Sequence, residues 1–262
     1  MKTPCLRNLL SAAGLLALLM ASTMVTPAQS VAAADTRHAT RGKVVSSKPA
    51  TAGMAVTQNK ETQTAMTPAQ ALEMLRAGNA RFASGKMLRR DLSKQVKETA
   101  EGQYPFASLV SCLDSRTSSE LLFDQGLGDI FNARVAGNIV NEDILGSLEF
   151  ASKVAGSKLI VVIGHTNCGA IKGAIDDVKL GNLTGLLSKI RPALDEADHH
   201  HTTHTSKNHA LVEEVAEINV KRMMREIREK SPVLKEMLDK GEIMLVGGMY
   251  DLSTGRVTFY QK

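Results

Sequence analysis

Short apolar runs alternate with amphipathic segments in the middle of the chain. Residues 106–110 and 159–163 are almost wholly apolar, and residues 130–135 are predicted to form a further strand. Runs that are apolar on both faces are typical of strands buried in a parallel sheet. Two segments with helical spacing, 118–123 and 142–154, separate these runs. The order of strand, helix, strand, helix and strand predicts an α/β fold.

A capping pattern marks the start of a helix ahead of these strands. Thr67 suits the N-cap, Pro68 suits the first helical position, and Gln70 completes a capping box. Apolar residues continue at helical spacing to Phe82, and Gly85 is a suitable stop. The sequence therefore predicts an N-terminal helical arm.

The C-terminal part continues the alternation. Residues 198–208 are polar and predict a loop, and residues 210–230 have the spacing of a long amphipathic helix. Residues 243–260 are predicted to form two further strands around a turn at 251–255. The predicted fold is a central, mainly parallel β-sheet flanked by helices.

The first residues have the form of a secretory signal peptide. Lys2 and Arg7 supply positive charge, residues 9–20 form an apolar core, and Ala34 ends a run of small residues suited to cleavage. A membrane-spanning helix needs about 20 apolar residues, and this run is shorter. We expect a signal peptide at 1–34, a periplasmic or secreted mature protein, and no stable membrane insertion after cleavage. A retained interfacial anchor is the alternative.

Residues 35–65 are rich in Ala, Thr, Ser, Gln and Lys, which predicts a disordered lead-in. The remainder, 66–262, is long enough for a single domain with a substantial core. The net charge of +5 is modest, and three Tyr, six Phe and no Trp leave few rings for base stacking. Nucleic-acid binding therefore has no support in the sequence.

Two short motifs follow two of the predicted central strands. They are Cys112-Leu113-Asp114-Ser115-Arg116 and His165-Thr166-Asn167-Cys168. In open α/β sheets, ligands bind at the carboxyl ends of the strands. Thiolate and imidazole are ligands that Zn²⁺ prefers, and three protein ligands leave the fourth position open for chemistry. We interpret the two motifs as one catalytic zinc site.

The cysteine count bears on this interpretation. The sequence has three cysteines, and loss of the signal peptide would remove Cys5 and leave Cys112 and Cys168. A disulfide is the alternative for such a pair in an exported protein. His165 and Asp114 favour the metal, because they give each cysteine a second potential ligand close by in the sequence.

Histidines gather in the polar segment before the predicted long helix: His199, His200, His201, His204 and His209. An exposed hydrophilic insertion is the simplest interpretation. Imidazole titrates near physiological pH, so a proton relay is a second interpretation. A weak surface site for zinc or copper is a third.

An ordered set of motifs runs through residues 66–258. In chain order, these are Gly102-Gln103, Cys112-x-Asp114-Ser115-Arg116, Gly128-Asp129-Ile130-Phe131, Arg134-Val135-Ala136-Gly137-Asn138, Ser147-Leu148-Glu149-Phe150, Gly164-His165-Thr166-x-Cys168-Gly169 and Tyr250-Asp251-Leu252-x-Thr254-Gly255. This set resembles the β-class carbonic anhydrases. The resemblance implies one zinc ion per subunit, held by Cys112, His165 and Cys168.

The resemblance also implies that Asp114 and Arg116 form the catalytic dyad, with Arg116 keeping Asp114 away from the metal. Gln103 is expected beside the substrate pocket. Val135 can supply an apolar wall for CO₂, and Gly169 can begin a helix whose N–H groups face an anionic ligand. Family membership implies a homodimer or a tetramer of dimers, with active sites at the subunit interface.

The reaction implied is the reversible hydration of CO₂ to bicarbonate and a proton by attack of zinc-bound hydroxide. Two thiolates cancel the charge of Zn²⁺, so activity should rise toward alkaline pH. Some members inhibit themselves through a bicarbonate pocket with a tryptophan at the position of Leu109. This chain has no Trp, which favours an open site with water at the fourth position.

Two other functions remain open on the sequence. Relatives with the same ligands hydrolyse carbonyl sulfide or carbon disulfide, and access to the pocket separates these activities. A non-catalytic, zinc-stabilised binding module would require Asp114 to close the site as a fourth ligand. The presence of both Asp114 and Arg116 argues against the binding module.

Overall fold

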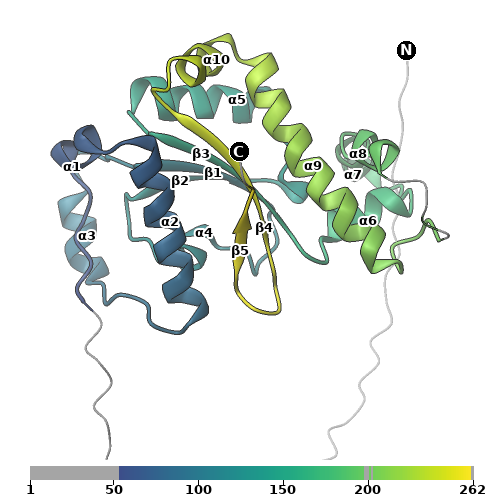
Figure 1. Cartoon of the computed structure of the whole chain (residues 1–262), viewed down its shortest axis with the longest axis horizontal. Helices are drawn as coiled ribbons and strands as arrows, with labels where there is room; N and C mark the ends of the chain where they lie inside the picture. Colours follow the sequence, from purple (N-terminus) through teal and green to yellow (C-terminus); the bar gives the residue numbers. More distant parts are fainter. Residues whose placement is uncertain (1–52, 198–200, 202, 261–262) are drawn as a thin grey trace, which may run out of the picture. The chain divides into compact units, whose positions relative to one another are not determined.

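The computed structural model describes residues 53–197, 201 and 203–260, and Figure 1 shows their arrangement. The chain divides into two units, Met1–Lys48 and Pro49–Lys262, and every described residue belongs to the second. The expected signal peptide at 1–34 lies outside the described residues, as do positions 35–52 of the expected lead-in. His199 and His200 are outside them too.

Five strands form one sheet in the order β2-β1-β3-β4-β5. The strands are β1 Ala107–Ser111, β2 Ile130–Arg134, β3 Leu159–His165, β4 Met244–Tyr250 and β5 Val257–Phe259. The first four pair in parallel, and β5 pairs antiparallel with β4. The predicted mainly parallel sheet is therefore confirmed, including the two C-terminal strands.

Helices flank both faces of this sheet (Figure 1). They are α1 Lys60–Ala65, α2 Pro68–Ala83, α3 Leu92–Glu98, α4 Ser119–Leu122, α5 Glu142–Glu149, α6 Gly169–Ile175, α7 Gly181–Leu187, α8 Arg191–Glu196, α9 His209–Lys230 and α10 Pro232–Asp239. Two short helices of other types complete the set. They are the 3₁₀ helix η1 Ala136–Asn138, which is wound more tightly than an α-helix, and the π-helix η2 Phe150–Val154, which is wound more widely.

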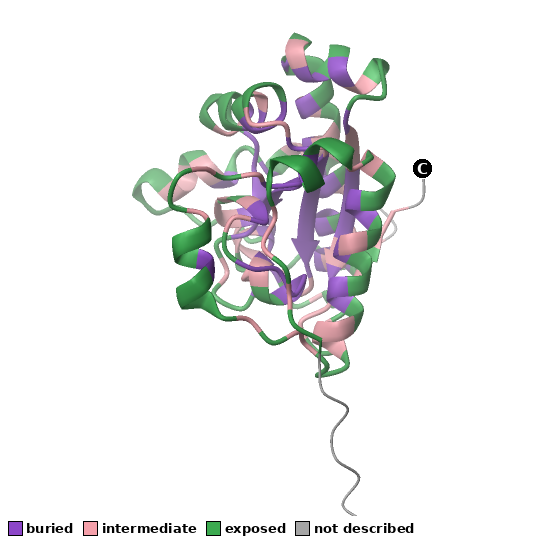
Figure 2. Cartoon of the chain, turned by 90° about the vertical axis from the view of Figure 1, so that its left-hand side faces the viewer, coloured by how far each residue is buried: buried purple, intermediate pink, exposed green. Residues whose placement is uncertain are grey.

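The two faces of the sheet build two cores, because successive side chains of a strand point to opposite sides. Val110 of β1 and Val162 of β3 join the core that packs against α6, α8, α9 and α10. Leu109 and Val161 join the core that packs against α2 and β5. Figure 2 shows these central strands as buried, with exposed residues on the outer sides of the helices.

The predicted N-terminal helix is confirmed as α2. Thr67 accepts a hydrogen bond from the N–H of Gln70 at 3.2 Å, and the Gln70 side chain accepts one from the N–H of Thr67 at 2.9 Å. Gly85 follows the end of the helix with a φ of 68°, which suits glycine. Leu72 and Leu75 are buried in the second core, so α2 packs on the sheet of its own chain.

One boundary of the expected lead-in is wrong. Residues 60–65 form α1 rather than a disordered segment, with Asn59 and Thr62 in a capping box. The buried amide of Gln63 donates to the carbonyl oxygens of Pro105 and Ala155, both at 2.8 Å. Polar caps and the Gln63 amide, rather than apolar side chains, hold residues 60–65 against the rest of the domain. This explains why the segment has a polar composition and still forms a helix.

The predicted single helix at 142–154 is divided into α5 and η2. The last residues widen into a π-helix, and the N–H of Ser157 then bonds the carbonyl of Ala151 at 2.9 Å. Phe150 remains half exposed there, although it belongs to an apolar pattern. The wide turn leads the chain back to the start of β3.

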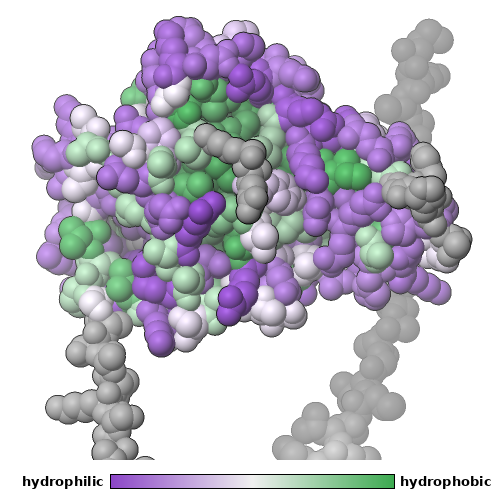
Figure 3. Space-filling view, viewed as in Figure 1, coloured by the Kyte–Doolittle hydropathy of each residue, from purple (hydrophilic) through white to green (hydrophobic). Residues whose placement is uncertain are grey.

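The long predicted helix is confirmed as α9, which begins after Asn208 caps it through the N–H of Leu211. Figure 3 shows hydrophilic residues along its outer side and apolar residues between it and the C-terminal strands. A groove of about 500 Å³ lies there, and Met244, Leu245 and Arg225 are among the residues that line it. None of the helices in the described ranges is long and apolar enough to cross a membrane.

Candidate metal centre

The strand order places the two motifs beside each other. The chain leaves β1 for β2 at the sheet edge and returns to β3 on the other side of β1, so the order reverses between β1 and β3. Cys112 directly follows β1, and His165 is the last residue of β3. Ser111 pairs with Ile163 in the register of these strands. The motifs therefore meet at the carboxyl edge, at the switch point where such folds bind ligands.

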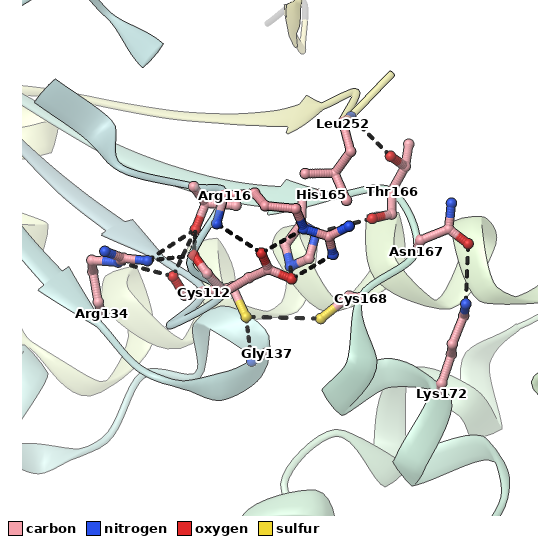
Figure 4. Close-up of polar contacts among 12 residues, drawn as sticks. Cys112, Arg116, Arg134, Gly137, His165, Thr166, Asn167, Cys168, Lys172 and Leu252 are labelled. Carbon is pink, nitrogen blue, oxygen red and sulfur yellow. Dashed lines mark hydrogen bonds and ion pairs between the residues drawn. The ribbon is translucent and has the colours of Figure 1, made fainter. Parts of the chain in front are cut away.

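Three potential ligands gather at this edge (Figure 4). The Sγ atoms of Cys112 and Cys168 are 3.9 Å apart, and the ligand atoms of Cys112, His165 and Cys168 all lie within 4.8 Å of one another. All three side chains are buried. They form the only such group of three or more metal-binding side chains among the residues that the structure describes.

One ring nitrogen of His165 is held by the backbone, and the other is free to bind a metal. Nδ1 lies 2.9 Å from the carbonyl oxygen of Thr166, an acceptor, so Nδ1 bears the proton. Nε2 is buried and has no hydrogen-bond partner among the described residues. A ligating histidine has this arrangement, since the bond at one nitrogen fixes the tautomer and directs the lone pair of the other.

Both cysteines are free thiols, and their separation of 3.9 Å is far longer than a disulfide bond of about 2.05 Å. The contact with Cys168 lowers the pKa of Cys112 below its ordinary value, despite burial, and the N–H of Gly137 contributes. The pKa of Cys168 is raised, first by its bond to Cys112 and then by burial. A cation between the sulfurs would displace the retained proton.

Asp114 and Arg116 form the pair expected of them. Nε and Nη2 of Arg116 donate to Oδ1 and Oδ2 of Asp114 at 2.9 Å and 2.7 Å, and the backbone N–H of Arg116 donates to Oδ1 at 3.0 Å. These bonds hold the pKa of Asp114 well below its usual range. Asp114 is therefore a carboxylate at the edge of the cluster, oriented by Arg116.

Two side chains to which the sequence motifs assign no role shape the loop between these residues. Thr117 donates to the carbonyls of Cys112 and Asp114, at 2.9 Å and 2.8 Å. Arg134, at the end of β2, donates to the same two carbonyls (Figure 4). Both residues thus fix the backbone that presents Cys112 and Asp114. The sequence offered one signal for Arg134, because a basic residue at the end of a predicted strand can reach a neighbouring ligand loop.

The expected substrate-pocket residues divide into two groups. Val135 is half-buried and bonds through its N–H to the carbonyl of Ser111 at 3.1 Å, so it lies at the carboxyl edge. Gly169 begins α6. The N–H groups of Ala170 and Ile171 in that helix favour the thiolate of Cys168, because they lower its pKa against the effect of burial.

Gln103 lies elsewhere. It is exposed and precedes the amino end of β1, whereas Cys112 follows the carboxyl end. A five-residue strand spans about 16 Å at ~3.3 Å per residue. The structure therefore does not bring Gln103 to the ligands of its own subunit.

The donor set suits zinc. Two sulfurs and one imidazole nitrogen are ligands that Zn²⁺ favours, and the buried, unpartnered Nε2 of His165 faces two free thiols. Three ligands would leave one position of a tetrahedral metal open, and Asp114, with Oδ2 4.0 Å from Nε2 of His165, does not belong to the set. The geometry agrees with an open site.

The histidine-rich segment is only partly within the described residues. Nε2 of His201 lies 2.6 Å from a carboxylate oxygen of Glu214 on α9, and Asn208 lies 3.3 Å from its other nitrogen. His204 and His209 are exposed. The interpretations of this segment remain predictions.

Comparison with known proteins places the chain among carbonic anhydrases. Residues 107–257 match the family described as carbonic anhydrase. Carbonic anhydrase 2 of Mycobacterium tuberculosis is 33% identical over 190 residues, which cover 72% of this chain and 91% of that protein.

Solved structures show the same fold. A Coccomyxa β-carbonic anhydrase in complex with acetazolamide has a TM-score of 0.58 at 26% identity, covering 73% of this chain and 85% of the other. One of two tetrameric β-carbonic anhydrases of Sordaria macrospora has a TM-score of 0.56 at 23% identity, covering 65% and 91%. With the sheet order and the Cys, His and Cys cluster, these findings show that the chain belongs to the β-carbonic anhydrase family.

Proposed function

We propose that this enzyme catalyses the zinc-dependent, reversible hydration of CO₂ to bicarbonate and a proton. The observation that supports it most directly is the buried Nε2 of His165, which lacks a hydrogen-bond partner in the described part of the chain and lies beside the thiols of Cys112 and Cys168. Burying a polar nitrogen without a partner costs free energy, and a bound metal would remove that cost. Family membership supports the same reaction.

Cys112, His165 and Cys168 would hold one zinc ion in each subunit. Zinc held there would act as a Lewis acid, lowering the pKa of water so that hydroxide is available near neutral pH. The backbone N–H groups of Gly137, Ala170 and Ile171 stabilise the negative charge of the two sulfurs.

Asp114 would orient the attacking oxygen. Its lowered pKa keeps it ionised, so it can only accept hydrogen bonds. Oδ2 lies 4.0 Å from Nε2 of His165. At that distance it could accept a hydrogen bond from a water or hydroxide positioned to attack CO₂. Arg116 restrains both carboxylate oxygens, which prevents Asp114 from rotating into the ligand set.

Val135 would provide an apolar wall for CO₂, since it packs against the first core at the carboxyl edge of the sheet. Gly169 begins α6, so the first N–H groups of this helix would face an anionic ligand such as bicarbonate in the pocket. A homodimer or tetramer of dimers is part of the proposal. Gln103 would then reach the pocket of a neighbouring subunit, because its own pocket lies at the other end of β1.

We also propose that the mature enzyme is periplasmic or secreted, on the basis of the charged, apolar and small-residue segments in residues 1–34. N-terminal sequencing of the exported protein would test this. Cleavage after Ala34 is the expected result, and an intact N-terminus in the cytoplasmic fraction would contradict it.

Stopped-flow CO₂ hydration by the zinc-loaded protein tests the central proposal. Turnover is expected to require zinc and to increase between about pH 6.5 and 9, because two thiolates cancel the charge of the metal. Cys168→Ser should lose both zinc and turnover, whereas Ser188→Ala, an exposed position on the surface, should keep both. A zinc-replete protein without CO₂ turnover would contradict the proposal, and hydrolysis of carbonyl sulfide or carbon disulfide would then identify the alternative.

A further inference from the structure

Gly137 links the first cysteine to the long helix α9. Its backbone N–H donates to Sγ of Cys112 at 3.4 Å, and its carbonyl oxygen accepts from Nδ2 of Asn219 at 2.8 Å. The first of these bonds is visible in Figure 4. Two different peptide groups are involved, so Asn219 acts on Gly137 by fixing its position rather than by polarising one shared amide.

Gly137 needs such an external restraint. It lies at a kink in η1 with a φ of 70°, in the left-handed region that glycine occupies at little cost. A Cβ atom at this position would meet Cδ1 of Ile190 at 2.7 Å and Cβ of Ala170 at 3.3 Å. The site therefore requires a glycine, and glycine has the most conformational freedom to lose. Because Gly137 has no side chain that could pack and restrain it, hydrogen bonds from neighbouring elements must hold its backbone in place.

Asn219 is an unusual residue for its place on α9. The other buried residues of this helix are apolar: Leu211, Val212, Val215, Ala216, Val220, Met223 and Ile227. Asn219 is fully buried, and its Oδ1 has no hydrogen-bond partner among the described residues. An apolar side chain would avoid the cost of burying an amide. Within the described part of the chain, the bond from Nδ2 to Gly137 explains an asparagine here.

The neighbourhood of Gly137 also reaches the second cysteine. Ala170, whose Cβ would lie 3.3 Å from a Cβ at position 137, belongs to the first turn of α6, and its N–H lowers the pKa of the Cys168 thiol. A displaced Gly137 would therefore disturb the surroundings of both thiolates. Mutation of a residue that hydrogen-bonds to a metal ligand typically costs about 10-fold to 100-fold in metal affinity.

We propose that Asn219 is a positioning residue of the metal centre, which holds Gly137 so that its N–H remains directed at the sulfur of Cys112. This inference rests on the proposed function, because it requires Cys112 to be a metal ligand. Asn219 itself contacts neither metal nor substrate, and it acts only through Gly137.

Asn219→Ala tests the proposal in the full-length protein. Its dissociation constant for zinc, measured by competition with a chelator, is expected to rise about tenfold. In the cobalt-substituted protein, the thiolate-to-cobalt charge-transfer bands are expected to shift, because the hydrogen bond to one sulfur is lost. Ile227→Ala is the matched control. This residue is equally buried on α9, eight residues further on and about 12 Å along the helix axis.

Ile227→Ala should lower the melting temperature without moving the zinc affinity or the cobalt bands. A folded Asn219→Ala protein with wild-type zinc affinity and wild-type cobalt bands would overturn the positioning role while leaving the proposed function intact. A wild-type protein that binds no zinc would overturn both together.

A measurement on the wild-type protein covers the case in which Asn219→Ala does not fold. With ¹¹³Cd in place of zinc, a scalar coupling through the sulfur of Cys112 to the amide proton of Gly137 is expected in the NMR spectrum. Slow exchange of that amide with solvent is expected as well. A Gly137 amide that exchanges freely and shows no coupling would overturn the inference.

Discussion

Oδ2 of Asp114 lies 2.7 Å from Nη2 of Arg116 and 4.0 Å from Nε2 of His165, so one oxygen stands between the arginine and the ligand set. The arginine holds the second oxygen too, at 2.9 Å. This bidentate contact fixes the plane of the carboxylate as well as its position. Asp114 is thereby kept close to the metal site without entering it.

Arg116→Ala should lower kcat/KM for CO₂ hydration about 100-fold, the usual effect of a misplaced catalytic group. Without the guanidinium, Asp114 can rotate toward the three ligands and occupy the fourth position. Zinc content should therefore stay at the wild-type level while turnover falls, and stopped-flow kinetics with metal analysis would measure both. Arg191→Ala removes a surface arginine paired with Asp177 and should change neither quantity. Full turnover in Arg116→Ala would show that the arginine does not restrain Asp114.

Arg134→Ala should reduce kcat/KM roughly tenfold to 100-fold, since the guanidinium supports the backbone on both sides of Leu113. Arg134→Lys should not restore activity, because an ammonium group cannot reproduce the fork of donors. Asn132→Ala is the matched control, two residues earlier on the same strand and bonded to Glu120. Equal losses in Arg134→Ala and Asn132→Ala would assign the effect to the strand edge rather than to the ligand loop.

Asp124 should make folding sensitive to acid. It is fully buried and accepts hydrogen bonds from Arg81, Arg90 and the N–H of Leu88. Burial alone would raise its pKa, but these bonds outweigh burial and hold the pKa below the ordinary value. A group with a lowered pKa stabilises the fold above the unfolded pKa of about 3.9 and loses this effect as the pH falls through the folded pKa.

Asp124→Asn should therefore reduce the free energy of unfolding at pH 7 by about 3 kcal/mol, because two arginines lose their buried partner. Urea unfolding at several pH values would measure it, and the difference from wild type should shrink below about pH 4. Asp239→Asn, which breaks exposed ion pairs with Arg228 and Lys235, should have little effect at either pH. A difference that stays constant with pH would contradict the assignment.

Gln63→Ala should destabilise the protein by about 2 kcal/mol, because the carbonyls of Pro105 and Ala155 would lose a buried donor. Chemical unfolding measures this loss. Glu61→Ala, on the exposed side of the same helix, provides the comparison and should be nearly neutral. An unchanged stability in Gln63→Ala would mean that α1 contributes little to the domain.

Much of the fold follows from local rules that the sequence displays. The capping box of Thr67 and Gln70 involves neighbours in the chain, and the apolar runs of β1 and β3 are buried on both faces. The short helix α1 was missed because its attachment depends on one amide and two distant carbonyls. Interactions of that kind leave no periodic pattern.

The residues of the site also separate into those that local sequence patterns predict and those whose roles depend on long-range contacts. Cys112, His165 and Cys168 were predictable because they are rare residue types at or just after the ends of two apolar strands. Arg134 belongs to one of the sequence motifs, but its role could not be predicted, and neither could that of Asn219, since their partners are backbone groups brought close only by the tertiary fold. Gln103 shows the opposite limit, because its position in a motif did not reveal that it lies at the other end of β1 from the ligands.

The pairing of β1 with β3 also sets the order in which the protein can mature. Cys112 and His165 are far apart in the sequence and become neighbours only when these two strands align. No short segment of the chain holds all three ligands, so the complete ligand set exists only after the sheet has formed. A three-ligand metal site would therefore be completed after the sheet, and until then both thiols would be open to any oxidant.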